Sequence, residues 1–290
     1  MPEASTLADE QSSPLQNPRS EILKTVLICH ESDDIDHIVT ARWLASFSDL
    51  AGVIVLREKA QRMKTRIKRE IKRVGYLRFI DVLAFRIYYK LFLAKKDELW
   101  RKELVEKYCR IYPELKDVPT LITYSPNSDE AENFLRDAKP DIVIARCKTL
   151  LKKNIFTLAK TATVVFHPGI CPEYRNAHGC FWALAQNDFE KVGMTLLQID
   201  EGIDTGPIFG YYSYDYDAAT ESHIVIQTRV VTENLSKLQT KLQEIHNGTA
   251  RRLDVKGKQS NVWGQPWLTA YWKIKKDAKQ SLNTKRQMLK

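Results

Sequence analysis

The chain has 290 residues, a formal net charge of +9 and 43% hydrophobic residues. That apolar content argues against a mostly disordered chain, and the length allows one large α/β domain or two modest ones. No window of about 18 uncharged apolar residues occurs, so a membrane-spanning helix is not expected. Residues 1–22 are polar and lack the apolar region of a secretory signal, so they are expected to form a disordered tail.

The positive charge is concentrated in two segments. Residues 57–78 and 273–290 carry net charges of +8 and +6, which leaves −5 for the rest of the chain. The composition therefore indicates a mildly acidic body with two basic segments, which disfavours a uniformly basic nucleic-acid binder. Five cysteines without a C-x-x-C pair suit reduced thiols in the cytoplasm and predict neither a zinc site nor a disulfide framework.

Short apolar runs alternate with helical patterns along the first 217 residues. The runs predict buried strands without polar alternation at Thr25–His30, Gly52–Leu56, Pro119–Tyr124, Asp141–Ala145 and Thr163–Phe166. Helices are expected at residues 33–47, 129–137 and 151–159, between these strands. Such an order predicts an α/β fold with a doubly wound, mostly parallel sheet over residues 23–217, whose ligands bind at the carboxyl ends of the strands.

Two segments extend this pattern. A helical insertion at residues 57–115 separates the second and third strands and begins with the basic run. Residues 76–93 predict a helix that packs on the body and leaves one face exposed to solvent. The alternative is that residues 57–93 form a basic, aromatic helix that docks on an anionic membrane or a large substrate. Residues 218–290 are expected to form a long amphipathic helix at 220–245 and an aromatic, basic tail that docks on the body.

The stretch Thr163–Gly210 carries the residues with the clearest chemistry. It predicts a strand that ends in His167, a loop with Pro and Gly, a helix at 177–187, a strand at 192–199 and an acidic turn that holds Asp204. A histidine at a strand end and an aspartate on a later loop can meet in one cleft, where the carboxylate orients the imidazole for acyl-type chemistry. On spacing alone, ordinary structural roles for both residues remain the alternative.

The same stretch resembles the formyltransferase family that uses 10-formyltetrahydrofolate. The family pattern N-x-H-P falls on residues 165–168, and Cys171–Pro172 stands in the place of its L-P pair. Tyr174–Asn176 takes the Tyr-Arg-Gly place, and D-E-G-x-D-T-G is complete at Asp200–Gly206. Residues 140–151 are also similar to the family's strand and folate-loop segment.

The resemblance implies a formyltransferase Rossmann-like fold with His167 and Asp204 as the catalytic pair. It implies 10-formyltetrahydrofolate as formyl donor, without a metal, held by a loop at 146–151 and a turn at 200–203. The expected folate-binding residues are Arg146, Cys147, Leu150, Asp200, Glu201 and Ile203. In the family mechanism the acceptor amine attacks the formyl carbon, His and Asn stabilise the oxyanion, and Asp supports the His and assists proton removal.

One position departs from the family pattern. Val165 stands where the family has the Asn of N-x-H, and an isopropyl group cannot donate a hydrogen bond to an oxyanion. Losing one such donor typically lowers the rate by about 10²–10³. We expect Asn176 or His178 to supply the missing donor. The alternatives are a bulged register or a more reactive acceptor, and a chain that binds folate or carries out a related transfer without formylating.

We therefore predict a cytoplasmic formyltransferase that acts on a primary amine of a small metabolite, with an amino sugar as the favoured acceptor. Arg175 is expected to anchor an acceptor phosphate, with His178 beside it in the acceptor site. A nucleic-acid partner is not expected, because the tRNA-specific branch continues into a C-terminal β-barrel and this chain shows a helix and a short tail there. The rival hypotheses are a non-catalytic folate-binding protein and a peripheral enzyme with a membrane-linked acceptor; a homodimer stays open.

Overall fold

The computed structural model describes residues 22–58 and 63–288. The expected N-terminal tail at 1–22 therefore lies outside the described residues, apart from its last residue, as does part of the basic run. Within the described part of the chain the strand boundaries follow the apolar runs of the sequence closely, whereas the helix expected at 151–159 is the shorter α5 at Lys153–Phe156.

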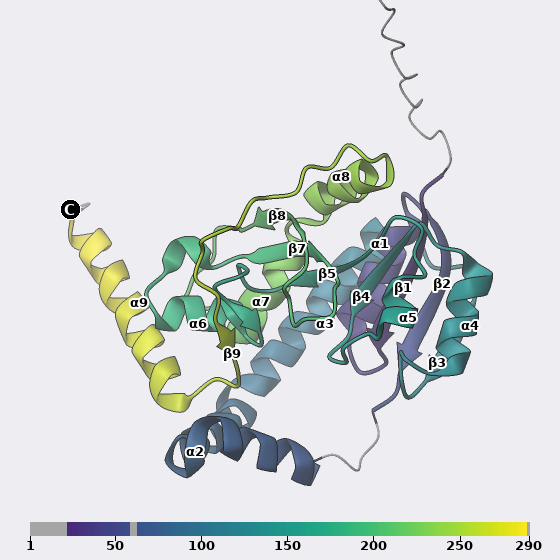
Figure 1. The fold of residues 1–290 in the computed structure, drawn as a ribbon. Coiled ribbons are helices and arrows are strands. Elements are labelled where there is room, and N and C mark those ends of the chain that lie inside the picture. The colour runs from purple at the N-terminus through teal and green to yellow at the C-terminus, as the bar shows by residue number, and fades with distance from the viewer. Residues whose placement is uncertain (1–21, 59–62, 289–290) are drawn as a thin grey trace, which may run out of the picture.

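A mixed sheet forms the centre of the molecule (Figure 1). Its strand order is β3-β2-β1-β4-β5-β7-β8. Strands β1 to β5 run parallel, β7 pairs antiparallel with both β5 and β8, and β8 therefore runs in the same direction as β5. The strands are β1 (Lys24–His30), β2 (Asp49–Leu56), β3 (Thr120–Thr123), β4 (Ile142–Arg146), β5 (Ala162–His167), β7 (Met194–Gln198) and β8 (Ile208–Tyr212). This confirms the predicted α/β fold with a doubly wound, mostly parallel sheet.

Helices cover both faces of the sheet because alternate strand residues point to opposite sides. Val26 and Ile28 of β1 pack with Leu135 against the helices on one face, whereas Leu27 and Cys29 join the larger core on the other. The first face carries α4 (Asp129–Ala138) and α5 (Lys153–Phe156). The larger core includes residues of η1 (Ile35–Thr40), α1 (Ala41–Ala45), α6 (Gly179–Ala185), α7 (His223–Thr232) and α8 (Leu235–His246).

The long helix expected at 220–245 is two helices, α7 and α8. The break falls at Asn234, which is buried and whose side-chain amide donates to the carbonyl oxygens of Ser213 and Val230 at 3.0 and 2.9 Å. Asparagine favours such local bonds to the backbone over a place inside a helix. The apolar spacing continues across the break, so it could not reveal it.

The insertion forms α2 (Met63–Tyr88), η3 (Tyr89–Leu93) and α3 (Ala94–Ile111). Gly75 interrupts α2 with a φ of 78°, a conformation that favours glycine. Beyond it, Val82 and Phe85 are buried against the body. None of the helices in the described ranges is long and apolar enough to cross a bilayer.

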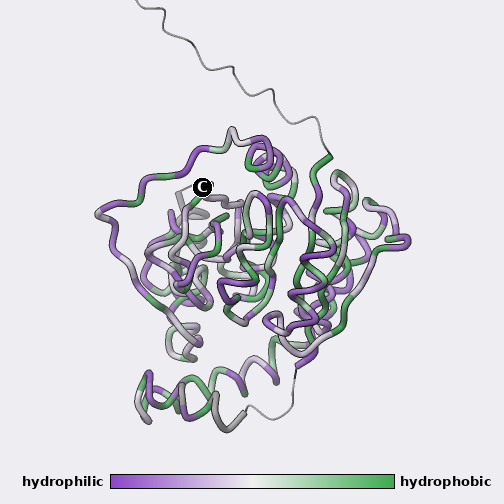
Figure 2. Tube along the Cα trace, turned by 45° about the vertical axis from the view of Figure 1, so that its right-hand side comes forward, coloured by the Kyte–Doolittle hydropathy of each residue, from purple (hydrophilic) through white to green (hydrophobic). Residues whose placement is uncertain are grey.

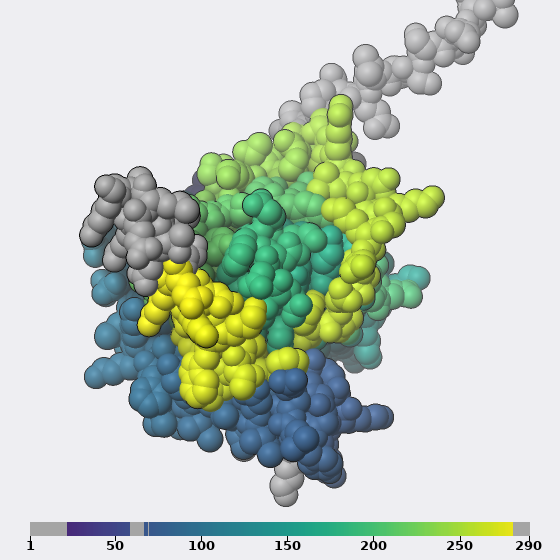
Figure 3. All heavy atoms as spheres, turned by 90° about the vertical axis from the view of Figure 1, so that its left-hand side faces the viewer, coloured from purple at the N-terminus to yellow at the C-terminus, as the bar shows by residue number. Residues whose placement is uncertain are grey.

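The C-terminal segment docks on the body through β9 (Val262–Trp263) and α9 (Leu268–Met288). β9 pairs with β6 (Arg175–Asn176) in a small second sheet, and Tyr271 and Ile274 of α9 are buried in the larger core. In Figure 3 the yellow α9 lies directly against the blue insertion. The aromatic part of the segment thus packs against the protein, as expected from its composition.

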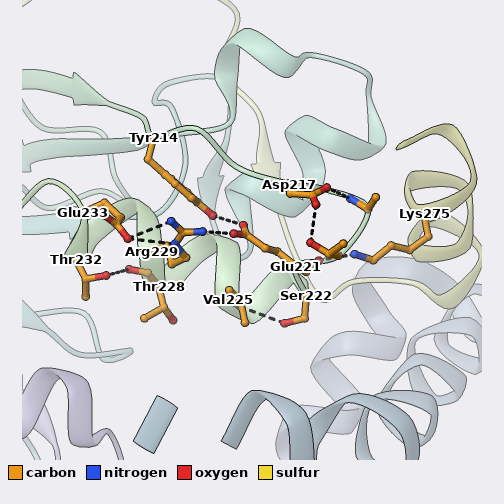
Figure 4. A network of polar contacts seen from close by, with 12 residues as sticks. Tyr214, Asp217, Glu221, Ser222, Val225, Thr228, Arg229, Thr232, Glu233 and Lys275 are labelled. Carbon is orange, nitrogen blue, oxygen red and sulfur yellow. Dashed lines mark hydrogen bonds and ion pairs between the residues drawn. The ribbon is translucent and has the colours of Figure 1, made fainter. Parts of the chain in front are cut away.

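A polar network joins α9 to α7 (Figure 4). Lys275 of α9 donates to the carbonyl oxygens of Ala218 and Glu221, and the Glu221 carboxylate pairs with Arg229 of α7. Burial lowers the pKa of the Lys275 ammonium to about 8. The two carbonyl oxygens compensate the half-buried ammonium group for part of the hydration that it loses.

Asp81 of α2 should stabilise the start of α9. Its carboxylate accepts hydrogen bonds from the backbone N–H of Thr269, at 3.1 Å, and from the Thr269 hydroxyl. Because it satisfies an N-terminal donor and complements the helix dipole, Asp81→Ala should lower the free energy of unfolding by about 0.5–2 kcal/mol. Urea denaturation measures this, and hydrogen exchange should show faster exchange in α9. Glu114→Ala, at an exposed carboxylate, is the control; equal unfolding midpoints for both variants would contradict the assignment.

Candidate active site

His167 and Asp204 come together at the carboxyl end of β5. The Nδ1 atom of His167 lies 3.5 Å from Oδ2 of Asp204, and the two side chains are 6% and 16% exposed. The other ring nitrogen, Nε2, lies 2.8 Å from the carbonyl oxygen of Tyr174. Both ring nitrogens therefore face an oxygen acceptor, and a substrate atom that bonds to Nε2 must displace the Tyr174 carbonyl.

The turn that presents Asp204 has little room for substitution. Asp204 itself has a φ of 51°. Oδ1 of Asp200 accepts from the N–H of Gly202 at 2.9 Å and from the Thr205 hydroxyl at 2.7 Å. A Cβ atom at Gly206 would lie 1.9 Å from the backbone oxygen of Gln198. The D-E-G-x-D-T-G motif is thus explained by the shape of the turn as well as by its carboxylates.

Asn176 contacts the same carboxylate through its backbone. Its N–H donates to Oδ2 of Asp204 at 2.8 Å, while its side-chain amide donates to the carbonyl of Trp263 in β9. The φ of Asn176 is 78°, which explains why the family pattern has Gly at this place and why Asn is a tolerated substitute. Because the side-chain amide of Asn176 already donates to Trp263, the role of Asn176 as an oxyanion donor stays a prediction.

A small cavity of about 80 Å³ lies beside Asp204, between the loop after β4 and the acidic turn. Four of the predicted folate-binding residues line it, namely Cys147, Leu150, Asp200 and Glu201. Thr149, Leu151 and Gly202, which also line it, fall in the predicted loop and turn, whereas Ala145, Leu197 and Ile199 of the apolar wall were missed by the sequence prediction. The alternation of residues along β7 could have indicated Leu197, since inward-facing positions on a strand recur at every second residue.

The lining of this cavity fits a flat heterocycle with N–H donors, because apolar walls meet carboxylate acceptors. Its volume is well below the roughly 300–1,000 Å³ of typical ligand pockets. Leu150, in the loop after β4, is 59% exposed. Val165 occupies the wall near the catalytic pair and offers no hydrogen bond there.

Arg146 and Ile203 have other contacts. The guanidinium of Arg146 lies 2.7 Å from Oδ1 of Asp36 and donates to the carbonyl of Phe166. The carbonyl of Ile203 accepts from Nη1 of Arg175 at 2.9 Å. The assignment of Arg146 and Ile203 to folate binding stays a prediction.

The two predicted acceptor residues have different contacts. Arg175 holds the turn through the Ile203 carbonyl. His178 precedes α6 with a φ of 56°, and its ring lies 5.6 Å from that of His223 in α7. The Nδ1 atoms of His178 and His223 are buried without a hydrogen-bond partner. Substrate roles for Arg175 and His178 stay predictions.

Comparisons with known proteins agree on the family. Residues 100–242 match the formyl transferase family. The methionyl-tRNA formyltransferase of Desulfotalea psychrophila is 34% identical over 108 residues, which are 37% of this chain and 33% of that protein. The human mitochondrial 10-formyltetrahydrofolate dehydrogenase is 27% identical over 111 residues, 38% of this chain and 12% of that protein. The match with each of these two relatives thus spans one third or less of the relative's length.

The fold is shared more widely than the sequence. The crystal structure of a sugar N-formyltransferase candidate from Mycobacterium tuberculosis superposes with a TM-score of 0.51 at 14% identity. The superposition covers 89% of this chain and 87% of that protein.

The buried histidines should make stability depend on acidity. Burial lowers the pKa of the His178 imidazole to about 4. Between pH 6.5 and 4 this imidazole is therefore protonated in the unfolded chain but neutral in the folded chain. The free energy of unfolding should fall by up to about 1.4 kcal/mol per pH unit over this range. Denaturation at pH 7 and pH 5 should show a smaller loss for His178→Gln than for the unmodified chain. Equal losses would contradict this assignment.

Proposed function

Because the chain belongs to the formyl transferase family through residues 100–242, we propose that it transfers a formyl group from 10-formyltetrahydrofolate to a primary amine. The observation that carries the proposal is the contact of His167 with Asp204, 3.5 Å apart, beside the cavity that Asp204 also lines. The five cysteines are unpaired, which suits a reducing compartment such as the cytoplasm.

The donor would be held by residues of the loop after β4 and of the acidic turn. Cys147 and Leu150 would contact its ring from one side, and Asp200 and Glu201 would offer oxygen acceptors from the other. The donor supplies an electrophilic formyl carbon bound to N10. The apolar wall around Leu197 excludes water from this side of the ring.

His167 and Asp204 would carry out the proton transfer. The amine nitrogen forms a bond to the formyl carbon as the bond to N10 breaks, so one proton must leave the amine and one must reach N10. Asp204 would orient the His167 ring. Once the Tyr174 carbonyl is displaced, Nε2 of that ring would take the proton from the amine and pass it to N10. A protonated ring also stabilises negative charge on the formyl oxygen.

We propose that the acceptor is a small molecule and, within that class, an amino sugar. Residues 163–210 hold two Lys/Arg and six Asp/Glu, so their net charge is −4. An acidic site attracts an ammonium group and repels a polyanion such as RNA. This electrostatic preference favours a small cationic amine over a nucleic-acid acceptor.

Replacing either member of the catalytic pair should reduce turnover. His167→Ala and Asp204→Asn should each lower kcat by about 100-fold or more, since proton transfer in the transition state is lost. Release of tetrahydrofolate across a panel of amines, amino-sugar nucleotides included, measures this. His37→Ala and Asp137→Asn, which change the same residue types away from the site, are the controls. If both site variants keep normal turnover with the true acceptor, the assignment fails.

Val165→Asn tests whether a missing donor limits the rate. An amide at this position of β5 would restore a hydrogen-bond donor beside the formyl oxygen, and the expected gain in kcat is about 10- to 1,000-fold. Val165→Leu, which changes size without adding a donor, is the matched control. A gain in both variants, or in neither, would show that the donor at this position does not limit turnover.

A further inference from the structure

The outer face of α2 carries a row of exposed apolar side chains, here called the apolar stripe. It consists of Tyr76, Ile80, Leu83 and Ile87, spaced at three or four residues and so aligned on one side of the helix. The exposed fractions are 76%, 62%, 45% and 53%. Leu77, beside the stripe, is 87% exposed. Soluble proteins rarely leave such a contiguous apolar surface uncovered unless it binds something.

The opposite side of α2 packs against the body of the protein, so the stripe is not the side of the helix that forms the core. Val82 and Phe85 are 1% and 4% exposed and pack against the body, where Phe85 meets Tyr271 of α9 at 5.2 Å between ring centroids. The helix is therefore apolar on two sides. In Figure 2 hydrophobic residues, in green, alternate with hydrophilic ones, in purple, along α2 at the lower edge of the molecule.

The apolar surface continues beyond α2. Leu91 and Phe92 in η3 are 69% and 67% exposed, and Phe92 contacts the Tyr88 ring at 5.0 Å. Trp272 of α9 is half exposed and lies edge-on to the same Tyr88. Aromatic side chains of this kind are enriched where a protein meets the headgroup region of a membrane.

Basic side chains lie beside the stripe and in the part of α2 that precedes Gly75. Lys68 and Lys72 are exposed in the first part of α2, and Arg86 and Lys90 are exposed beside the stripe itself. Residues 57–78 alone carry ten Lys/Arg against two Glu. A second copy of this chain would bring like charges together on the same face, whereas an anionic surface is complementary to it.

We propose that the apolar stripe and its basic flank dock the protein on an anionic lipid membrane, with α2 lying in the plane of the interface. An amphipathic helix with Lys/Arg beside a buried apolar face binds in this way, through apolar burial and attraction to anionic headgroups. The protein lies on the bilayer and does not span it.

Docking would bring the catalytic pair close to the lipid surface. In Figure 1 α2 lies on the side of the molecule toward which the arrow of β2 points, where the carboxyl ends of the parallel strands also lie. The Arg86 guanidinium of α2 is one of the cations that lower the pKa of His178, which follows the catalytic loop. Resting on the proposed function, this placement suits an amine carried by a membrane-linked acceptor.

Co-sedimentation with vesicles tests the docking itself, independently of any formyl transfer. The full chain is mixed with vesicles of phosphatidylcholine alone or with phosphatidylglycerol added, at low and at high salt. Binding is expected to the anionic vesicles and to weaken with salt. The double variant Lys68→Gln/Lys72→Gln should lower the partition coefficient roughly 30-fold, at about 1 kcal/mol per charge. Lys237→Gln/Lys256→Gln, two exposed lysines elsewhere, should leave it unchanged.

Ile80→Asp/Ile87→Asp tests the apolar part and should abolish binding, with Ile122→Asp on the exposed edge strand β3 as control. The milder Ile80→Ser/Ile87→Ser double variant keeps the test valid if the charged variant unfolds. Equal binding to neutral and anionic vesicles, or no binding to either, would overturn the proposal. So would a dimer in vesicle-free solution, seen by light scattering, that the Ile80 and Ile87 variants dissociate. Because vesicle binding is scored without substrate, its failure is distinguishable from failure of the formyl transfer.

Discussion

The carboxylate of Asp204 is the contact on which the site depends. Its Oδ2 atom faces Nδ1 of His167 and accepts from the backbone N–H of Asn176 at 2.8 Å. One oxygen thus joins the end of β5, the loop that follows it and the acidic turn more than 20 residues later. Because each ring nitrogen of His167 already faces an oxygen, chemistry at the ring is coupled to the position of the loop that holds the Tyr174 carbonyl.

That loop is in turn fixed by the C-terminal segment. Trp263 of β9 accepts from the Asn176 amide at its carbonyl and donates through its indole N–H to the carbonyl of Glu173 at 2.9 Å. Its ring stacks on Tyr174 and on Trp182 of α6. The C-terminal helix α9, which follows β9, packs against α2. The proposed membrane surface and the catalytic loop are therefore linked through contiguous packing.

Apolar runs predicted the sheet well because buried parallel strands must be continuously apolar, as Ile142–Ala145 of β4 is. The break between α7 and α8 was missed because it depends on two side-chain bonds of Asn234 to the backbone, which spacing does not record. The resemblance to formyltransferases pointed to His167 and Asp204, and the geometry brings them together. The resemblance could not show that the Asn176 amide donates to Trp263. That hydrogen bond depends on the pairing of β6 with β9 across more than 80 residues.

The cavity beside Asp204 is the place where we propose that the folate binds. The most direct measurement is a crystal structure of the protein soaked with 5-formyltetrahydrofolate, a stable analogue of the donor. The pterin ring is expected between the Cys147–Leu151 loop and the Asp200–Asp204 turn, with the loop displaced to widen the cavity. Density for the analogue elsewhere, or an empty and unchanged cavity at saturating analogue, would contradict this proposal.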